Sequence, residues 1–241
     1  MLGYPDQALR NIHEALTLAQ ELDHPFSLAY ALIMAAVVHQ FRREAQALQE
    51  RAEAAIAVST EHGFPHWLAF GMFLRGWAIT AQGGGAEGIS LIHQGLTSHR
   101  VTGAEVEKPY FLALLTEAYG KVGQPEEGLK VLVEALAIVD NTGERNWEAE
   151  LHRCKGELLL MQQGQKVGEA EECFQQALNI ARRQQAKSFE LRAAMSLSRL
   201  WQQQGKQEEA LQMLADIYGW FTEGFDTVDL QEAKALLEEL A

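Results

Sequence analysis

A pattern of three small or apolar residues recurs along this chain with a period of about forty residues. Each copy occupies positions i, i+4 and i+7, which lie on one stripe of an α-helix. The copies begin at residues 8, 48, 88, 128, 170 and 210, and the one longer interval falls across 162–168, where a turn can absorb two residues. The period predicts helical units that stack, since one unit cannot bury its own apolar face. The copies are Ala8–Ile12–Ala15, Leu48–Ala52–Ala55, Gly88–Ile92–Gly95, Gly128–Leu132–Ala135, Ala170–Phe174–Ala177 and Ala210–Leu214–Ile217.

A second helical segment precedes each stripe from the second repeat onward. Gly3, Gly123 and Gly205 each lie five residues before a stripe, where glycine can end a helix in the left-handed conformation. The unit is therefore helix, short turn, helix and longer loop, and no segment alternates with the period of two typical of a half-buried strand. The predicted preceding helices are 26–41, 64–81, 109–121, 147–161 and 188–203.

These units predict an all-α protein, a right-handed α-solenoid of about twelve helices in one repeat domain over 1–241. The first repeat supplies only its second helix. The predicted boundaries are 4–22 for that helix, about 25–62, 64–102, 105–142, 145–185 and 187–222 for the repeats, and 226–240 for a C-terminal capping helix.

Charge and cysteine content narrow the classes of partner. The formal net charge of −13 repels phosphate backbones, so we expect no nucleic-acid partner. Two cysteines are too few for a disulfide framework, and no secretory signal is visible, which favours a reduced cytoplasmic protein. The most apolar stretch, 28–38, is well short of the roughly 18–20 residues that span a bilayer, so we expect no membrane partner.

Two motifs that resemble ligand sites lack the residues that the chemistry needs. The glycine-rich segment 83–88 has neither the Gly-Lys-Ser/Thr of a phosphate-binding loop nor a preceding strand, so it reads as an interhelix turn. His62 and His66 have the spacing of a helical metal pair, but Gly63 and Pro65 between them predict a turn. We expect no metal and no cofactor in this chain.

Nucleophilic catalysis is also unsupported. His152 and Cys154 lie two residues apart on a predicted helix, so they point about 200° away from each other, and Cys173 sits beside a packing stripe. We expect no catalytic residue. Glu150 and Arg153 have helical pair spacing and are expected to form a solvated surface pair. An aromatic cluster is expected to seal the core under the last helix: Tyr218, Trp220, Phe221 and Phe225.

The repeat pattern resembles the tetratricopeptide repeat. The stripe after a glycine-containing turn resembles the second helix of that repeat, and Leu112, Leu115 and Tyr119 resemble the first. The usual period is about 34 residues, so the longer period here implies longer helices or loops, as in extended variants of bacterial regulators.

A closer resemblance covers the last hundred residues or so. The segments 147–160, 181–194 and 218–230 resemble, in order and spacing, the C-terminal repeat region of large bacterial adenylate/guanylate cyclase-like proteins. In that family a class III cyclase domain and a nucleotide-binding ATPase module precede a helical arm. The resemblance implies a regulatory, protein-binding arm whose associated cyclase or ATPase activity lies outside this chain. Two alternatives are an effector-sensing arm of a bacterial transcription regulator and a stand-alone adaptor.

The resemblance also implies a missing first helix, because Gly3 occupies the turn between the two helices of a repeat. We therefore expect this chain to be part of a longer protein. If Met1 is the native start, the uncapped first helix predicts a homodimer formed through that end.

In tetratricopeptide arrays the first helices line a concave groove that holds a protein or peptide, or neighbouring domains of the same polypeptide. Carried over by register, the groove is apolar in its N-terminal half and charged in its C-terminal half. Two alternatives are that tight curvature turns the apolar half into core, and that the charged half is only a solvated face. The predicted groove residues are Tyr30, Phe41, Phe70, Phe73, Trp77, Tyr110, Glu117, Lys121, Glu150, Arg153, Glu157, Arg192, Arg199 and Gln203.

Overall fold

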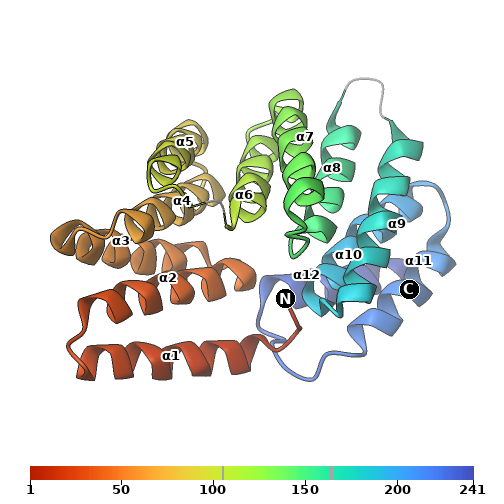
Figure 1. Ribbon diagram of the computed structural model, residues 1–241. Helices are drawn as coiled ribbons and strands as arrows, with labels where there is room; N and C mark the ends of the chain where they lie inside the picture. The colour runs from red at the N-terminus through yellow and green to blue at the C-terminus, as the bar shows by residue number, and fades with distance from the viewer. Residues whose placement is uncertain (105, 163–165) are drawn as a thin grey trace. The chain divides into compact units, whose positions relative to one another are not determined.

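The computed structural model describes residues 1–104, 106–162 and 166–241, and these residues form twelve α-helices and no strand (Figure 1). The all-α prediction is confirmed. Residues 163–165, inside the turn predicted at 162–168, lie outside the described residues. The helices are α1 Pro5–Glu21, α2 Pro25–Arg42, α3 Ala45–His62, α4 Pro65–Ala81, α5 Gly85–Val101, α6 Lys108–Lys121, α7 Pro125–Thr142, α8 Glu148–Met161, α9 Val167–Gln184, α10 Lys187–Gln203, α11 Gln207–Tyr218 and α12 Val228–Leu240.

The chain divides into two compact units. The N-terminal unit is Pro5–Glu107 and holds α1 to α5, and the C-terminal unit is Met1–Tyr4 together with Lys108–Ala241 and holds α6 to α12. The single domain over 1–241 stays a prediction, and each unit is described by itself.

Within each unit, helices pack on their neighbours in sequence and also on the helix two places along. In the N-terminal unit α2 contacts α4, and in the C-terminal unit α6 contacts α8, α8 contacts α10, and α10 contacts α12. Within each unit the first helices of the repeats therefore form an inner row, and the second helices pack outside it. This is the stacked-hairpin arrangement that the sequence period predicts.

The predicted turn glycines adopt the conformation that the sequence requires of them. Gly123 and Gly205 have φ angles of 71° and 78°, in the left-handed region that side chains with a Cβ rarely enter. Each follows the last residues of an inner helix, and the next helix begins two residues later. The turns predicted at Gly123 and Gly205 are thereby confirmed.

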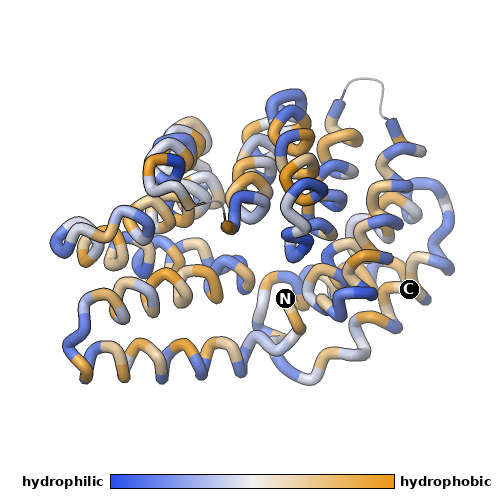
Figure 2. The backbone as a smooth tube through the Cα atoms, viewed as in Figure 1, coloured by the Kyte–Doolittle hydropathy of each residue, from blue (hydrophilic) through white to orange (hydrophobic). Residues whose placement is uncertain are grey.

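The repeating stripes are the buried faces of the second helices. All three residues are buried in five of the six copies, whereas in the first copy Ala15 of α1 is exposed and the buried positions are Ile12, Leu16 and Ala19. Figure 2 shows the matching alternation of hydrophobic and hydrophilic residues along α1. Glycine in a stripe allows a close helix approach, because a Cβ on Gly95 would lie 3.1 Å from the Ala69 carbonyl oxygen.

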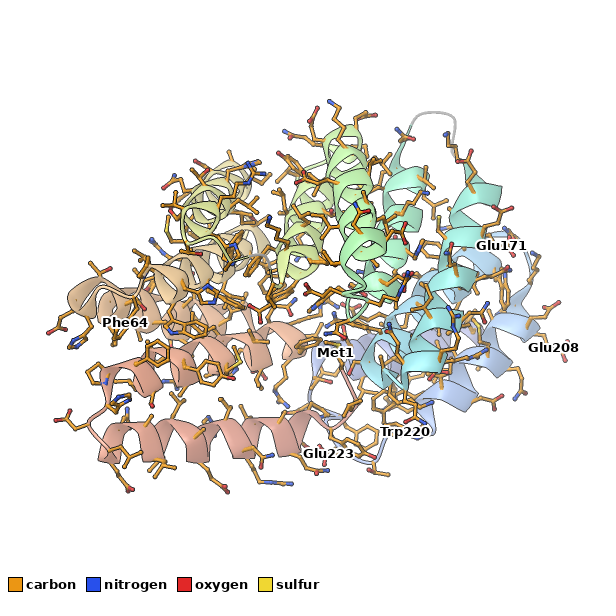
Figure 3. All side chains as sticks on the ribbon, in the orientation of Figure 1. Met1, Phe64, Glu171, Glu208, Trp220 and Glu223 are labelled. Carbon is orange, nitrogen blue, oxygen red and sulfur yellow. The ribbon has the colours of Figure 1, made fainter. Side chains whose placement is uncertain are left out.

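Residues 1–4 pack against the C-terminal end of their unit. The Met1 carbonyl oxygen accepts a hydrogen bond of 3.0 Å from the Ser188 amide, and the Tyr4 and Trp220 rings lie 5.5 Å apart (Figure 3). The aromatic cluster predicted to seal the core does so only in part. Phe221 is buried, but Phe225 is 50% exposed because it lies in the loop that precedes α12.

Candidate partner-binding surface

The apolar half of the predicted groove is mostly core. Phe70, Phe73 and Trp77 of α4 are at most 2% exposed, because α4 packs against α2, α3 and α5. Tyr110 of α6 is likewise buried, and its ring stacks on Trp147 at 4.4 Å. These four side chains make core contacts and are inaccessible to a partner in the folded protein.

Two predicted residues of α2 remain partly accessible. Tyr30 is exposed and Phe41 is half-buried. The Tyr30 ring lies 5.2 Å from the ring of Trp67, and the exposed Phe26 ring lies 5.8 Å from the same indole. Phe26, Tyr30 and Trp67 thus form an aromatic cluster at the start of α2 and α4 rather than a trough along these helices.

The charged half of the predicted groove is brought together on the inner helices α6, α8, α10 and α12. We call this set the inner charged surface. Arg192 and Arg199 pair with carboxylates on other helices, which sequence spacing alone does not reveal, whereas Lys121 and Arg153 pair along their own helices. Its members are Glu117, Lys121, Glu150, Arg153, Glu157, Arg192, Arg199, Asp229 and Glu232.

The centre of the inner charged surface is a buried ion-pair network. Arg192 Nε donates to Asp229 Oδ2 at 2.6 Å, and its Nη1 lies 3.7 Å from Glu150 Oε1. Arg153 binds both oxygens of Glu150, at 2.6 Å and 3.0 Å. The expectation that Glu150 and Arg153 form a solvated pair is therefore wrong, because α10 covers Glu150, which is 4% exposed.

The charges of this network stabilise one another. Burial by itself would lower the pKa of Arg192, but the carboxylates of Asp229 and Glu150 outweigh it and raise that pKa above its ordinary value. The network is thus a fixed set of paired charges.

The outer parts of the surface are accessible. Arg199 and Glu232 pair at 3.4 Å with both side chains more than a third exposed, and Gln203 is exposed one turn further on. At the other end, Lys121 pairs with Glu117 at 3.3 Å. A partner can therefore reach charged groups on both sides of the buried centre.

A cavity of about 230 Å³ lies between α6 and α8 at that second end. Four of the predicted groove residues line it, namely Glu117, Lys121, Arg153 and Glu157. Its apolar wall includes Leu158 and Met161. The hydroxyl of Thr116, which also lines the cavity, is buried and has no hydrogen-bond partner among the described residues. The cavity has the size of one large side chain.

The sequence missed Asp229, Ser196 and Thr116. Asp229 is an acidic residue in the first turn of the last helix, where the helix dipole favours a carboxylate. This local role gives no indication that Asp229 pairs with Arg192. Ser196 donates to Glu157 at 2.5 Å across 39 residues of sequence. No local signal identifies contacts over such separations.

The cysteine and histidine of α8 are not activated for catalysis. Burial raises the pKa of the Cys154 thiol far above its ordinary value, which disfavours the nucleophilic thiolate. Burial also lowers the pKa of His152, although Glu148 opposes the shift. Within residues 1–104, 106–162 and 166–241, no group of three or more His, Cys, Asp or Glu side chains is arranged to hold a metal ion.

The shift at His152 predicts a pH effect on stability. The folded state holds the imidazole neutral below the ordinary pKa of 6.5, whereas the unfolded state takes up the proton. The contribution of the buried neutral imidazole to the free energy of unfolding is therefore complete above pH 6.5 and is lost as the pH falls below that value. Urea titrations at about pH 7.5 and 5.5 are expected to show a smaller pH dependence for His152→Leu than for the wild type. The exposed His13→Leu is the control, and equal pH dependence in His152→Leu and the wild type would contradict the prediction.

Comparisons with known proteins show the fold. No family model matches the chain. An uncharacterized protein of Rhizobium meliloti (strain 1021) is 26% identical over 185 residues, which cover 77% of this chain and 18% of that protein. The chain therefore spans less than a fifth of the length of this relative.

Two solved structures of nearly identical TPR-like repeats from Podosopora anserina are similar to this chain. The first, of a variant with one substitution, has a TM-score of 0.54 at 22% identity, and the match covers 81% of this chain and 95% of that one. The second has a TM-score of 0.52 at 20% identity, with coverage of 90% and 97%. This likeness shows a TPR-like repeat fold. None of the helices in the described residues has both the length and the apolar character needed to cross a membrane.

Proposed function

We propose that this chain is a protein-interaction module without catalytic activity of its own. Its partner is a polypeptide that lies on the inner charged surface of the C-terminal unit. The observation that carries the proposal is the combination of accessible charges at both ends of that surface with the cavity between α6 and α8. The paired charges orient the partner, and the cavity accepts one of its side chains.

The buried ion-pair network serves this function as a rigid base. Arg192 and Asp229 hold α10 to α12, and Glu150 holds the Arg153 guanidinium beside the cavity. A surface fixed in advance loses less conformational entropy on binding. The network is therefore the scaffold, and Lys121, Glu157 and Arg199 are the residues that meet the partner.

We further propose that the module is a regulatory arm of a larger cytoplasmic signalling protein with cyclase or ATPase domains. The Rhizobium meliloti relative supports a longer parent, since the matching region is 18% of that protein. The buried, unpaired cysteines Cys154 and Cys173 are compatible with a reducing compartment. An effector-sensing arm of a transcription regulator, a stand-alone adaptor and a homodimer joined at its N-terminal end are the alternatives.

Selection of peptides on the purified chain tests the binding surface. Peptides from a random displayed library that bind the wild type are expected to lose at least about tenfold in affinity for Lys121→Glu/Arg199→Glu. The control is Lys130→Glu/Lys234→Glu, which makes the same charge change at two exposed lysines outside the inner charged surface. Loss of binding in both variants, or in neither, would contradict the proposal.

A further inference from the structure

A second groove lies on the outer side of the C-terminal unit, between α9 and α11 and above α10. Its volume is about 900 Å³, and residues of all three helices line it. It shares no residue with the inner charged surface or with its cavity. It is therefore a separate feature of the same unit.

The floor of this outer groove is apolar. It consists of Leu178 from α9, Leu197 and Trp201 from α10, and Met213 from α11. The one polar atom of the Trp201 side chain is already bonded, because its indole N–H donates to Glu171 at 2.8 Å. The accessible part of the floor is the half-buried side chains of Trp201 and Met213, since Leu178 and Leu197 are buried. The Lys206 ammonium lies 5.8 Å from the centre of the Trp201 ring.

The walls carry an unbalanced negative charge. Glu208, Glu209 and Asp216 line the groove, and Arg182 is the only basic side chain among its lining residues. Arg182 is already bonded to Glu190 at 3.0 Å. Glu208 and Glu209 are exposed and form no ion pair with any residue that the structure describes.

The acidic residue at the far end of the groove is not explained by the stability of its own helix. Asp216 lies in the last turn of α11, where the helix dipole disfavours a carboxylate. Its partner in the structure is the neutral Gln212 amide, at 2.9 Å. Glu208 and Glu209, by contrast, lie in the first turn, where acids are favourable.

Both walls repeat along the groove with helical spacing. On α11 the lining residues Glu209, Met213 and Asp216 occupy positions i, i+4 and i+7, so acid, apolar and acid follow one another over two turns. On α9 the lining residues Gln175 and Arg182 are seven apart, with Leu178 and Asn179 between them. On α11, the carboxylates of Glu209 and Asp216 are therefore about 10 Å apart along the helix axis.

We infer that the outer groove binds a basic amphipathic helix of a partner protein. On that helix, two Lys or Arg residues seven positions apart pair with Glu209 and Asp216. Apolar residues three and four positions after the first of these basic residues pack on the floor of the groove, which includes Met213. A helix matches the spacing, since two of its turns span the same distance as two turns of α11. This site is independent of the inner charged surface.

The probe for the test is a synthetic helical peptide of about 16 residues with Lys seven positions apart and Leu at the third and fourth positions between them. Fluorescence anisotropy of the labelled peptide is expected to show at least about tenfold weaker binding for Asp216→Asn and for Met213→Lys. Neither substitution removes an acid from the first turn of α11. The same peptide with Glu in place of Lys is expected not to bind.

The control for bulk charge is Glu14→Gln/Glu21→Gln/Glu61→Gln, three exposed acids of the N-terminal unit. It is compared with Glu208→Gln/Glu209→Gln/Asp216→Asn, which has the same charge change. A loss confined to the groove variants supports the inference. Equal losses in both triple variants, binding that survives Met213→Lys, or binding of the Glu peptide would overturn it.

Discussion

Replacing Arg192 with methionine is expected to lower the free energy of unfolding of the C-terminal unit by about 3–5 kcal/mol. The substitution keeps a long side chain but leaves Asp229 without its 2.6 Å partner and removes one cation beside Glu150. Both carboxylates are buried, so water cannot replace the lost guanidinium. Urea denaturation followed by circular dichroism measures the change.

The matched control is Arg199→Met, seven residues later on the same helix. Arg199 also pairs with an acid of α12, but that pair is 3.4 Å apart and exposed, so the expected loss is less than about 1 kcal/mol. The double variant Arg192→Met/Asp229→Asn is expected to be less destabilised than the sum of its single variants. Equal losses at Arg192 and Arg199 would show that the buried network contributes nothing beyond a surface pair.

The second large effect is expected in the N-terminal unit. There, Gly88→Ala should lower the free energy of unfolding by about 1–3 kcal/mol. A Cβ at this position would overlap the Thr80 hydroxyl and the Gly76 carbonyl oxygen, and it would lie 2.8 Å from the Thr80 amide nitrogen. Two of these three atoms belong to the backbone of α4, so relief requires the whole helix to move. Thermal or urea unfolding measures the loss.

Gly168→Ala is the control for this substitution. Gly168 lies in the first turn of α9, is exposed, and has no atom within 4 Å of an added Cβ. Alanine favours helix more than glycine by up to about 1 kcal/mol, so this variant is expected to be neutral or slightly stabilised. A similar loss at both glycines would mean that the close contact between α4 and α5 is not the cause.

The sequence by itself determined the helical hairpins and their boundaries. The forty-residue recurrence, the i, i+4, i+7 stripes and the turn glycines are local or periodic signals, and they predicted the inner helices to within about two residues at either end. They also predicted which face of α3, α5, α7, α9 and α11 is buried. Helix periodicity is sufficient for this, because it fixes which side chains share a face.

The tertiary structure alone decided what lies opposite each face. Register predicted that Phe70, Phe73 and Trp77 point inward, but their burial depends on the helices that pack around α4. Helical register likewise placed Glu150 and Arg192 on the inner faces of their helices. Their burial, however, depends on the packing of α10 and α12.

The outer groove was also outside the reach of sequence reasoning. In the sequence, Glu209, Met213 and Asp216 are ordinary positions on a surface helix. They line a groove only because of the spacing between α9 and α11. The physical reason is the same in each case. Spacing along the chain fixes the direction of a side chain from its own helix, but the environment that it meets depends on contacts between segments 30 to 40 residues apart.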